Sequence, residues 1–292
     1  MSITADEIAS QPEVWARALS DLGPAIAELT APGETMLVLG CGTSAYVAES
    51  FAFLREQAGF GVTDAAYASE PWTWRDWDRV LLITRSGTTS EVLDALDRIP
   101  VGVRTIAVTG VAESPVAARV DAVLLFDYAD ERSVVQTRFP TTFLVAARAA
   151  LGEDLAGLPG ELAAVLDRPL GIDPAAHDHF VYLGSGWTHG LAQEAALKIR
   201  ESAQAWAESY PLLDYRHGPI AVAHPGSLVW TFGPAAADFV DDIRATGGDV
   251  RVGTADPLVE LVQAQRLAVA VASSRGLNPD APRHLTRSII LS

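Results

Sequence analysis

The sequence predicts an α/β protein made of two doubly wound, flavodoxin-like subdomains, each with a parallel sheet. Three observations lead to this prediction. Short apolar segments of strand length alternate with longer amphipathic segments of helix length. A strand, a Gly-x-Gly turn and a helix occur twice, once in each half of the chain. Between the two halves lies a stretch rich in glycine and proline, residues 151–175.

The repeated unit sets the domain organisation. "MLVLGCGTSAYVAES" at 36–50 and "FVYLGSGWTHGLAQEA" at 180–195 share an apolar run, a Gly-x-Gly turn, a hydroxyl two residues later and a helix. We therefore place an N-terminal subdomain at residues 1–155 and a C-terminal subdomain at 156–292. The matched positions, at constant spacing, are Gly40 with Gly184, Gly42 with Gly186, Ser44 with Thr188, and Ala48 with Ala192.

The elements follow in chain order. Thr4 and Glu7 have capping-box spacing, which predicts a helix ahead of the first strand. Strands this short and apolar, alternating with helices, predict parallel sheets covered on both faces. In the first half, strands are expected at 36–40, 80–84, 103–109 and 121–127, and helices at about 44–57, 89–98, 114–119 and 134–150. A short helix near 160–167 precedes strands at 180–183, 227–232 and 249–252 and helices near 188–205, 236–246 and 257–274.

Composition narrows the function classes. The net charge of −16 argues against nucleic acid or an anionic membrane as a partner, since both need a basic surface. A single cysteine excludes an internal disulfide framework. There is no secretory signal and no run of roughly 18 apolar residues. We expect a cytoplasmic protein with no membrane partner.

A turn dense in hydroxyl groups follows the second apolar strand. In "LLITRSGTTSEVLDAL" at 81–96, serines and threonines crowd positions 84–90 just before a helix. A helix start offers unpaired N–H groups and partial positive charge, so an anion is a natural ligand. A helix N-cap with surplus hydroxyls explains the pattern about equally well. No lysine follows, which excludes a Walker loop.

Two other ligand classes are disfavoured. "GCGTSA" supplies only two of the three glycines of a dinucleotide-binding turn, and no acidic strand end follows about 20 residues later. His177 and His179 lie close in sequence, but no cluster of carboxylates or cysteines accompanies them. We expect neither a metal nor a cofactor.

The second half carries the candidate chemistry. In "LAQEAALKIRESAQAW", Glu194, Lys198 and Glu201 fall within about 60° on a helix at about 100° per residue. A solvent-facing ion pair is the usual explanation of such spacing. His217, however, lies between Arg216 and a Gly-Pro turn, a rigid exposed setting that suits a proton-transfer group. A carboxylate and an imidazole together suggest general acid–base catalysis.

The motifs "GCGTS", "RSGTTSEV", "EAALKIRE", "YRHGP" and "GLNPDAPRHLTRS" resemble those of the sugar isomerase (SIS) family. The family includes the isomerase domain of glucosamine-6-phosphate synthase and stand-alone glucosamine-6-phosphate deaminases. The likeness runs from "EIASQPEVW" near the N-terminus to the last ten residues. It implies two SIS-type subdomains and a sugar phosphate held by the two turns of the first half.

The resemblance also implies roles for individual residues. Glu201 resembles the base that moves a proton between C1 and C2. His217 resembles the ring-opening residue that reaches the neighbouring subunit's site, which implies a homodimer. Lys198 and Glu194 match charged positions on the same helix. The implied phosphate- and sugar-binding positions are Thr84, Arg85, Ser86, Thr89, Thr43, Ser44, the backbone at Cys41 and Gly42, and Val134 and Gln136. Cys41 is expected to contribute position and not reactivity.

Three departures from the synthase pattern shape the expected activity. No glutaminase domain is recognisable in these 292 residues, Arg287 stands where the synthase has a sugar-contacting lysine, and Arg138 replaces a common lysine or histidine. Arginine forms no Schiff base at ordinary pH. We expect an isomerase/deaminase that converts glucosamine 6-phosphate to fructose 6-phosphate and ammonia without a cofactor. A fructosamine-6-phosphate deglycase is the alternative enzyme, and a non-catalytic sugar-phosphate-binding regulatory module is the alternative of another class.

Overall fold

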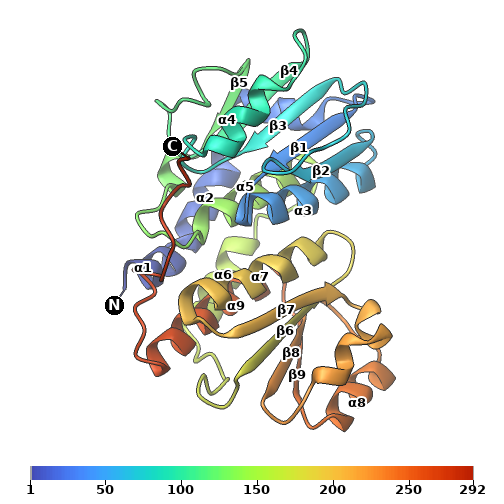
Figure 1. The fold of residues 1–292 in the computed structure, drawn as a ribbon, viewed down its shortest axis with the longest axis vertical. Coiled ribbons are helices and arrows are strands. Elements are labelled where there is room, and N and C mark those ends of the chain that lie inside the picture. The colour runs from blue at the N-terminus through green and yellow to red at the C-terminus, as the bar shows by residue number, and fades with distance from the viewer. Residues whose placement is uncertain (1, 292) are drawn as a thin grey trace. The chain divides into compact units, whose positions relative to one another are not determined.

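Two parallel β-sheets, one in each of two structural units, form the framework of the chain in a computed structural model that describes residues 2–291 (Figure 1). The N-terminal unit comprises Ser10–Gly160 and the tail from Thr286, and the C-terminal unit comprises Glu161–Leu285 and the residues up to Ala9. The α/β fold class with two parallel sheets is confirmed.

The N-terminal unit holds a five-stranded sheet in the order β2-β1-β3-β4-β5, with every pair parallel. Its strands are β1 (Met36–Gly40), β2 (Thr63–Tyr67), β3 (Arg79–Ile83), β4 (Arg104–Thr109) and β5 (Ala122–Leu125). Its helices are α2 (Gln11–Ser20), η1 (Pro24–Thr30), α3 (Thr43–Gln57), α4 (Ser90–Asp97), η2 (Asp127–Ala129) and α5 (Arg138–Ala150). The helix α6 (Leu158–Leu166) spans the division between the units.

Helices cover both faces of this sheet (Figure 1). Side chains of β1 and β3 such as Leu39 and Leu82 pack against Val92 and Leu96 of α4 on one face. On the other face α3 contacts β1 and β2 and packs against α5, where the rings of Phe51 and Phe143 lie 5.4 Å apart. Burial on both faces explains why the central strands are continuous apolar runs.

The C-terminal unit repeats this arrangement with a four-stranded parallel sheet in the order β7-β6-β8-β9. Its strands are β6 (His179–Gly184), β7 (Trp206–Pro211), β8 (Ser227–Thr231) and β9 (Asp249–Val252). Its helices are α1 (Ile3–Ala9), α7 (Thr188–Ala203), η3 (Asp214–His217), η4 (Pro219–Val222), α8 (Ala237–Ala245) and α9 (Pro257–Ser274). The helices α7 and α9 pack together, and Phe239 and Ile243 of α8 pack against Val181 and Leu183 of β6.

The internal duplication inferred from the sequence holds in three dimensions. A Cβ added at Gly40 would lie 2.5 Å from the backbone carbon of Ser44, and one added at Gly184 would lie 2.2 Å from the backbone oxygen of Thr188. Both glycines end the first strand of their sheet and let the next helix start against it. The following glycines, Gly42 and Gly186, both have positive φ, at 54° and 57°.

The structural units differ from the predicted ones in two ways. They divide after Gly160 and not after residue 155, and each end of the chain belongs to the unit formed mainly by the other half. The helix α1 belongs to the C-terminal unit, where Asp280 accepts hydrogen bonds from Ile3 N and Thr4 N, each at 2.8 Å, and from Thr4 Oγ1 at 2.7 Å. This distant carboxylate caps the helix, whereas the sequence predicted a capping box between Thr4 and Glu7. The tail joins the N-terminal unit through contacts described below.

Two strands were missed, and two predicted helices need correction. The strands β2 and β7 were not predicted. Both are edge strands paired on one side only, and their residues are mostly half-exposed or exposed. Residues 114–119 form turns and not a helix, since Val116 N bonds to the carbonyl of Gly87 in another loop. The helix expected at 134–150 starts at Arg138.

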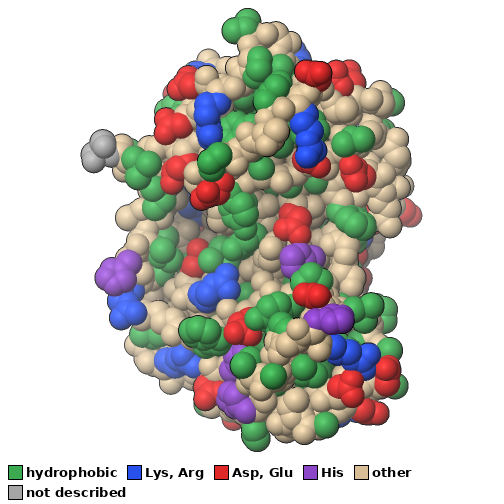
Figure 2. Space-filling view, turned by 45° about the vertical axis from the view of Figure 1, so that its right-hand side comes forward, with side chains coloured by type: hydrophobic (Ala, Val, Ile, Leu, Met, Phe, Trp, Pro, Cys, Tyr) green, Lys and Arg blue, Asp and Glu red, His purple; other side chains and the backbone are tan. Residues whose placement is uncertain are grey.

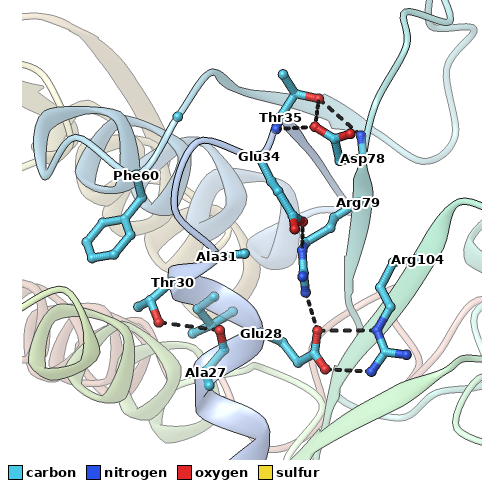
Figure 3. Close-up of polar contacts among 12 residues, drawn as sticks. Ala27, Glu28, Thr30, Ala31, Glu34, Thr35, Phe60, Asp78, Arg79 and Arg104 are labelled. Atoms are coloured by element: carbon cyan, nitrogen blue, oxygen red, sulfur yellow. Dashed lines mark hydrogen bonds and ion pairs between the residues drawn. The ribbon is translucent and has the colours of Figure 1, made fainter.

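An ion-pair network anchors η1 to the amino ends of β3 and β4 (Figure 3). Glu28 accepts from Arg79 and, at 2.6 Å, from Arg104, while Arg79 also donates to Glu34. The hydrogen bond from Arg104 is the main reason that the pKa of Glu28 lies below its usual value. Thr35 N donates to Asp78 at 2.8 Å beside this network. These charges brace the edge of the sheet opposite to the predicted ligand turns.

Acidic and basic side chains are interspersed over the face of the molecule drawn in Figure 2. Among residues 2–291, no helix is both long enough and apolar enough to cross a membrane.

Candidate active site

The two predicted ligand turns lie side by side in the N-terminal unit. β1 and β3 are adjacent, and Leu39 pairs with Leu82, so the carboxyl ends of both strands reach the same edge of the sheet. β2 lies on the other side of β1, so the strand order reverses at this point. Such a topological switch point is where doubly wound sheets bind ligands.

The first turn joins β1 to α3. Gly42 occupies the N-cap position with φ of 54°, and Thr43 and Ser44 form the first turn of the helix, each about 4% exposed. Burial raises the pKa of the Cys41 thiol to about 11, and the charge of Glu91 adds to the shift. A thiol with this pKa is protonated at neutral pH and is a poor nucleophile, and the positioning role of Cys41 stays a prediction.

The hydroxyl groups of the second turn shape the turn itself. Thr84 Oγ1 accepts from Gly87 N at 3.2 Å, and Ser86 Oγ accepts from Thr88 N at 3.3 Å and from Thr88 Oγ1 at 3.0 Å. Thr89 is the N-cap of α4 but makes no side-chain capping bond. Simple helix capping therefore does not account for the excess of hydroxyls.

Arg85 is 2% exposed, and its guanidinium faces protein. It donates to the carbonyl of Ser133 at 2.9 Å and to the carbonyl of Arg287 at 3.0 Å, and lies 3.9 Å from Glu131 Oε2. The side chain thus ties the second turn to the loop at 131–137 and to the tail. Its predicted part in phosphate binding stays a prediction.

Glu131 is a buried carboxylate that the sequence argument did not single out. It is fully buried, and its Oε1 accepts from Thr137 N at 2.5 Å, Thr137 Oγ1 at 2.6 Å and Arg138 N at 2.9 Å. This carboxylate folds residues 131–137 into a loop ahead of α5. Within that loop lie the predicted sugar-contacting positions Val134 and Gln136, and Gln136 Oε1 is buried with no hydrogen-bond partner among the residues described. A glutamate seven residues before the start of a helix was the available signal.

The tail docks on the second turn. Ser288 Oγ bonds Thr88 Oγ1 at 2.8 Å, and Ser90 N, at the start of α4, donates to the carbonyl of Ile289 at 3.1 Å. Arg287 donates to both carboxylate oxygens of Asp130, each at 2.6 Å. Part of the hydroxyl-rich turn therefore serves to hold the tail, and Arg287 is paired with protein.

The charged stripe predicted on α7 forms a buried triad in the C-terminal unit. Lys198 Nζ lies 2.6 Å from Glu201 Oε2 and 3.3 Å from Glu194 Oε1. Burial alone would lower the pKa of Lys198, but the two carboxylates outweigh it and raise that pKa. The solvent-facing ion pair that the spacing usually indicates is excluded, since the side chains of Glu194 and Lys198 are 0% and 1% exposed.

Glu201 is the member of the triad that reaches the surface, with its side chain 19% exposed. Its Oε2 accepts from Lys198, while its Oε1 has no hydrogen-bond partner among residues 2–291. A carboxylate held by one oxygen and open at the other has the arrangement of a general base.

His217 is exposed at the end of η3, and that short helix is held firmly. Tyr215 is fully buried in the core beside α8, and Arg216 pairs with Asp238 at 3.0 Å and Asp242 at 2.6 Å. The described part of the chain offers the His217 ring no hydrogen bond. The rigid, exposed setting inferred from the Gly-Pro turn is therefore present.

The predicted residues form two groups. The N-terminal unit gathers the turns, the loop at 131–137 and the tail, and the C-terminal unit holds the triad and His217. His177 and His179 face different partners, Asp249 and Glu208 respectively, and the side chains described in residues 2–291 include no cluster arranged to bind a metal.

Comparisons with known proteins agree with the motifs. Residues 29–151 match the family model described as SIS domain. The glutamine–fructose-6-phosphate aminotransferase (isomerizing) of Pyrobaculum aerophilum is 28% identical, over 97% of this chain and 56% of that protein. The chain thus spans about half the length of the curated relatives it matches.

Solved structures resemble the whole chain. The glucosamine-6-phosphate deaminase of Thermotoga maritima has a TM-score of 0.87 at 27% identity, covering 99% of this chain and 100% of that one. The tagatose-6-phosphate ketose/aldose isomerase of Escherichia coli shares the fold, with a TM-score of 0.79 at 21% identity over 100% of this chain and 96% of that one. These matches confirm the predicted resemblance to the SIS family, whose domain model matches residues 29–151.

Proposed function

We propose that this SIS-domain chain is a phosphosugar isomerase that converts glucosamine 6-phosphate to fructose 6-phosphate and ammonia. The observation that carries the proposal is the triad on α7, in which Lys198 holds one oxygen of Glu201 and leaves the other open. Solved relatives titled as a deaminase and as a ketose/aldose isomerase support the class of reaction.

In this proposal the two turns of the N-terminal unit hold the phosphate. Backbone N–H groups at the starts of α3 and α4 supply donors and partial positive charge. The hydroxyls of Ser44, Ser86 and Thr89 add side-chain donors. Local binding of this kind is needed because the net charge of −16 repels a doubly charged anion.

Proton transfer would then fall to Glu201 and His217. His217 donates a proton to the ring oxygen and opens the sugar, and Glu201 removes the proton from C2 and returns it to C1. The resulting imine at C2 takes up water and releases ammonia, which leaves the ketose phosphate. Lys198 keeps Glu201 oriented through the 2.6 Å hydrogen bond to Oε2.

We further propose that the active form is a homodimer in which His217 completes the site of the neighbouring subunit. What supports this is the exposure of His217 on a helix braced by Tyr215 and Arg216. A cytoplasmic location and the absence of nucleic-acid and membrane partners stay predictions from composition.

Amide transfer of the synthase type is not part of the proposal. Arg287 carries no nucleophilic amine, and its guanidinium is paired with Asp130 at 2.6 Å. A deglycase would use the same triad and turns, but it would move the proton from C1 to C2 and release the amine from C1.

Two assays with purified protein test the proposal. Ammonia release from glucosamine 6-phosphate is measured beside release of amines from fructosamine 6-phosphates, and proton exchange at C2 is followed by deuterium incorporation from solvent. We expect turnover of glucosamine 6-phosphate. Turnover of the fructosamine compounds alone would make the chain a deglycase, and binding without exchange would make it a regulatory module.

Variants assign the roles. Glu201→Gln should keep sugar-phosphate affinity but lose C2 exchange by a factor of about 10² to 10⁴. The matched control is Asp241→Asn, an exposed carboxylate of α8, which should leave exchange unchanged. Mixing Glu201→Gln with His217→Asn subunits should restore about a quarter of the activity if His217 acts across the dimer. Unchanged exchange in Glu201→Gln would remove that residue from its role.

A further inference from the structure

A cavity at the amino edge of the sheet in the C-terminal unit takes no part in the function proposed above. It has a volume of about 400 Å³ and is lined by Asp178, His179, Trp206, Glu208, Val222 and His224. His179 and Trp206 begin the neighbouring strands β6 and β7 and are register partners. We propose that this cavity binds an organic ammonium compound that carries no phosphate.

The charge of the cavity favours a cation. Two carboxylates line it, and no lysine or arginine does. Glu208 Oε1 accepts from Trp206 Nε1 at 2.8 Å and its Oε2 accepts from Tyr210 OH at 3.1 Å, so both oxygens are oriented by neutral donors. Asp178 lies 3.6 Å from His224 Nε2 and is largely exposed. Neither carboxylate has a permanently charged partner at the cavity, and a ligand phosphate would be repelled there.

A buried imidazole supplies one ring nitrogen without a hydrogen-bond partner among the residues described. His179 is 5% exposed, and its Nδ1 bonds Ser227 Oγ at 2.8 Å. Its Nε2 is buried with no hydrogen-bond partner among the residues described and lies 3.5 Å from Glu208 Oε2. Buried polar atoms are normally paired. With Nδ1–H donating to Ser227, an ammonium nitrogen about 2.9 Å from both Nε2 and Oε2 would donate to each.

An aromatic wall adds affinity for the body of such a ligand. Trp206 is 69% exposed, unusually open for this residue type, and its ring is fixed by the bond to Glu208. An indole face attracts both ammonium groups and the C–H faces of sugar rings. Val222 is a second apolar surface of the cavity, and the ring of His224 stacks on that of His179 at 5.7 Å. The ligand class is therefore an amino sugar or an alkylammonium ion. The histidines visible in Figure 2 all belong to this unit, because every histidine of the chain lies between residues 177 and 284.

The test is a titration of the full chain, followed by calorimetry and by tryptophan fluorescence. The probes are glucosamine, tetramethylammonium, glucose and glucosamine 6-phosphate. Saturable binding of glucosamine or tetramethylammonium, with none of glucose, is the expected result, and the two cations separate an amino-sugar site from an alkylammonium site. Glu208→Gln and Trp206→Ala should each weaken this binding about tenfold or more.

Controls separate the cavity from the active site. Glu153→Gln, a surface carboxylate of the N-terminal unit, should bind the cation as the native chain does, and so should Glu201→Gln. Absence of saturable binding for both cations would overturn the proposal. Full binding in both Glu208→Gln and Trp206→Ala would also overturn it, and displacement of the cation by glucosamine 6-phosphate would do so by moving the ligand to the active site. Failure of the phosphosugar assays would leave this test unaffected.

Discussion

Replacement of Lys198 by methionine tests the electrostatics of the triad directly. The Lys198 side chain is 1% exposed, and its ammonium lies 2.6 Å from Glu201 and 3.3 Å from Glu194. Methionine fills a similar volume without charge. The substitution therefore leaves two neighbouring carboxylates, one of them fully buried, without this counter-ion.

The expected loss is about 3 to 5 kcal/mol of unfolding free energy, the usual result of removing one partner of a buried ion pair. With a urea m-value of about 3 kcal/mol per M, the midpoint of unfolding should fall by about 1 to 1.7 M. Glu194→Gln added to Lys198→Met removes one of the two mutually repelling carboxylates and should recover a large part of the lost free energy of unfolding. The control Arg200→Met removes an exposed cation of α7 and one hydrogen bond to Ala207, which should amount to about 1 kcal/mol.

The direction in which the free energy of unfolding changes with pH is a second test. Because the pKa of Lys198 is raised in the folded state, its contribution is complete below the unfolded pKa of lysine and is lost as the pH rises through the folded pKa. In Lys198→Met this alkaline loss is absent. A gap below about 1 kcal/mol at pH 7, or one independent of pH, would refute this account of the triad.

Three further outcomes are expected. Gly184→Ala should lower the free energy of unfolding in urea by about 3 kcal/mol or more, because its Cβ would lie 2.2 Å from a backbone atom. Gly160→Ala in α6 has no atom within 4 Å of its Cβ and should raise that free energy by about 0.5 to 1 kcal/mol. Equal effects would contradict the steric argument. Glu28→Gln should lower the free energy of unfolding by about 1 to 2 kcal/mol at pH 7. Because the folded pKa of Glu28 is depressed, this difference should vanish as the pH falls through that pKa, below 4.5. A difference that persists in acid would exclude the charge as its cause. The Cys41 thiol, with a pKa of about 11, is about 0.1% thiolate at pH 8 and should react with a disulfide reagent slowly until the chain is unfolded; rapid labelling of the native chain would contradict that pKa.

The strands that are easiest to predict are buried inside their sheets, although the edge strands β5 and β9 were predicted as well. β1, β3, β6 and β8 lie inside their sheets and are buried along most of their length, so each is an unbroken apolar run. The edge strands β2 and β7 pair on one side only and carry polar and half-exposed residues, so the apolar pattern does not extend to them.

Part of the candidate site could be predicted because it depends on residue spacing within one helix. Helical spacing alone places Glu194, Lys198 and Glu201 on one face. Their burial could not be read from that spacing, which more often indicates a solvated ion pair. Glu131, Asp130 and Ser288 went unrecognised as supports of the turns, because each acts on residues brought close only by folding, as in the bond between Thr88 and Ser288.

The sequence by itself determined the duplicated α/β unit, the central strands, the turns at the carboxyl ends of β1 and β3 and the charged stripe of α7. Each depends on residue types at short, fixed spacing. Only the tertiary structure decided the exchange of the two chain ends, the docking of the tail on the second turn and the burial of the triad. The exchange and the docking depend on the capping of α1 by Asp280 and the bonding of Ser90 to Ile289, contacts between residues far apart in the chain whose pairing no local pattern encodes.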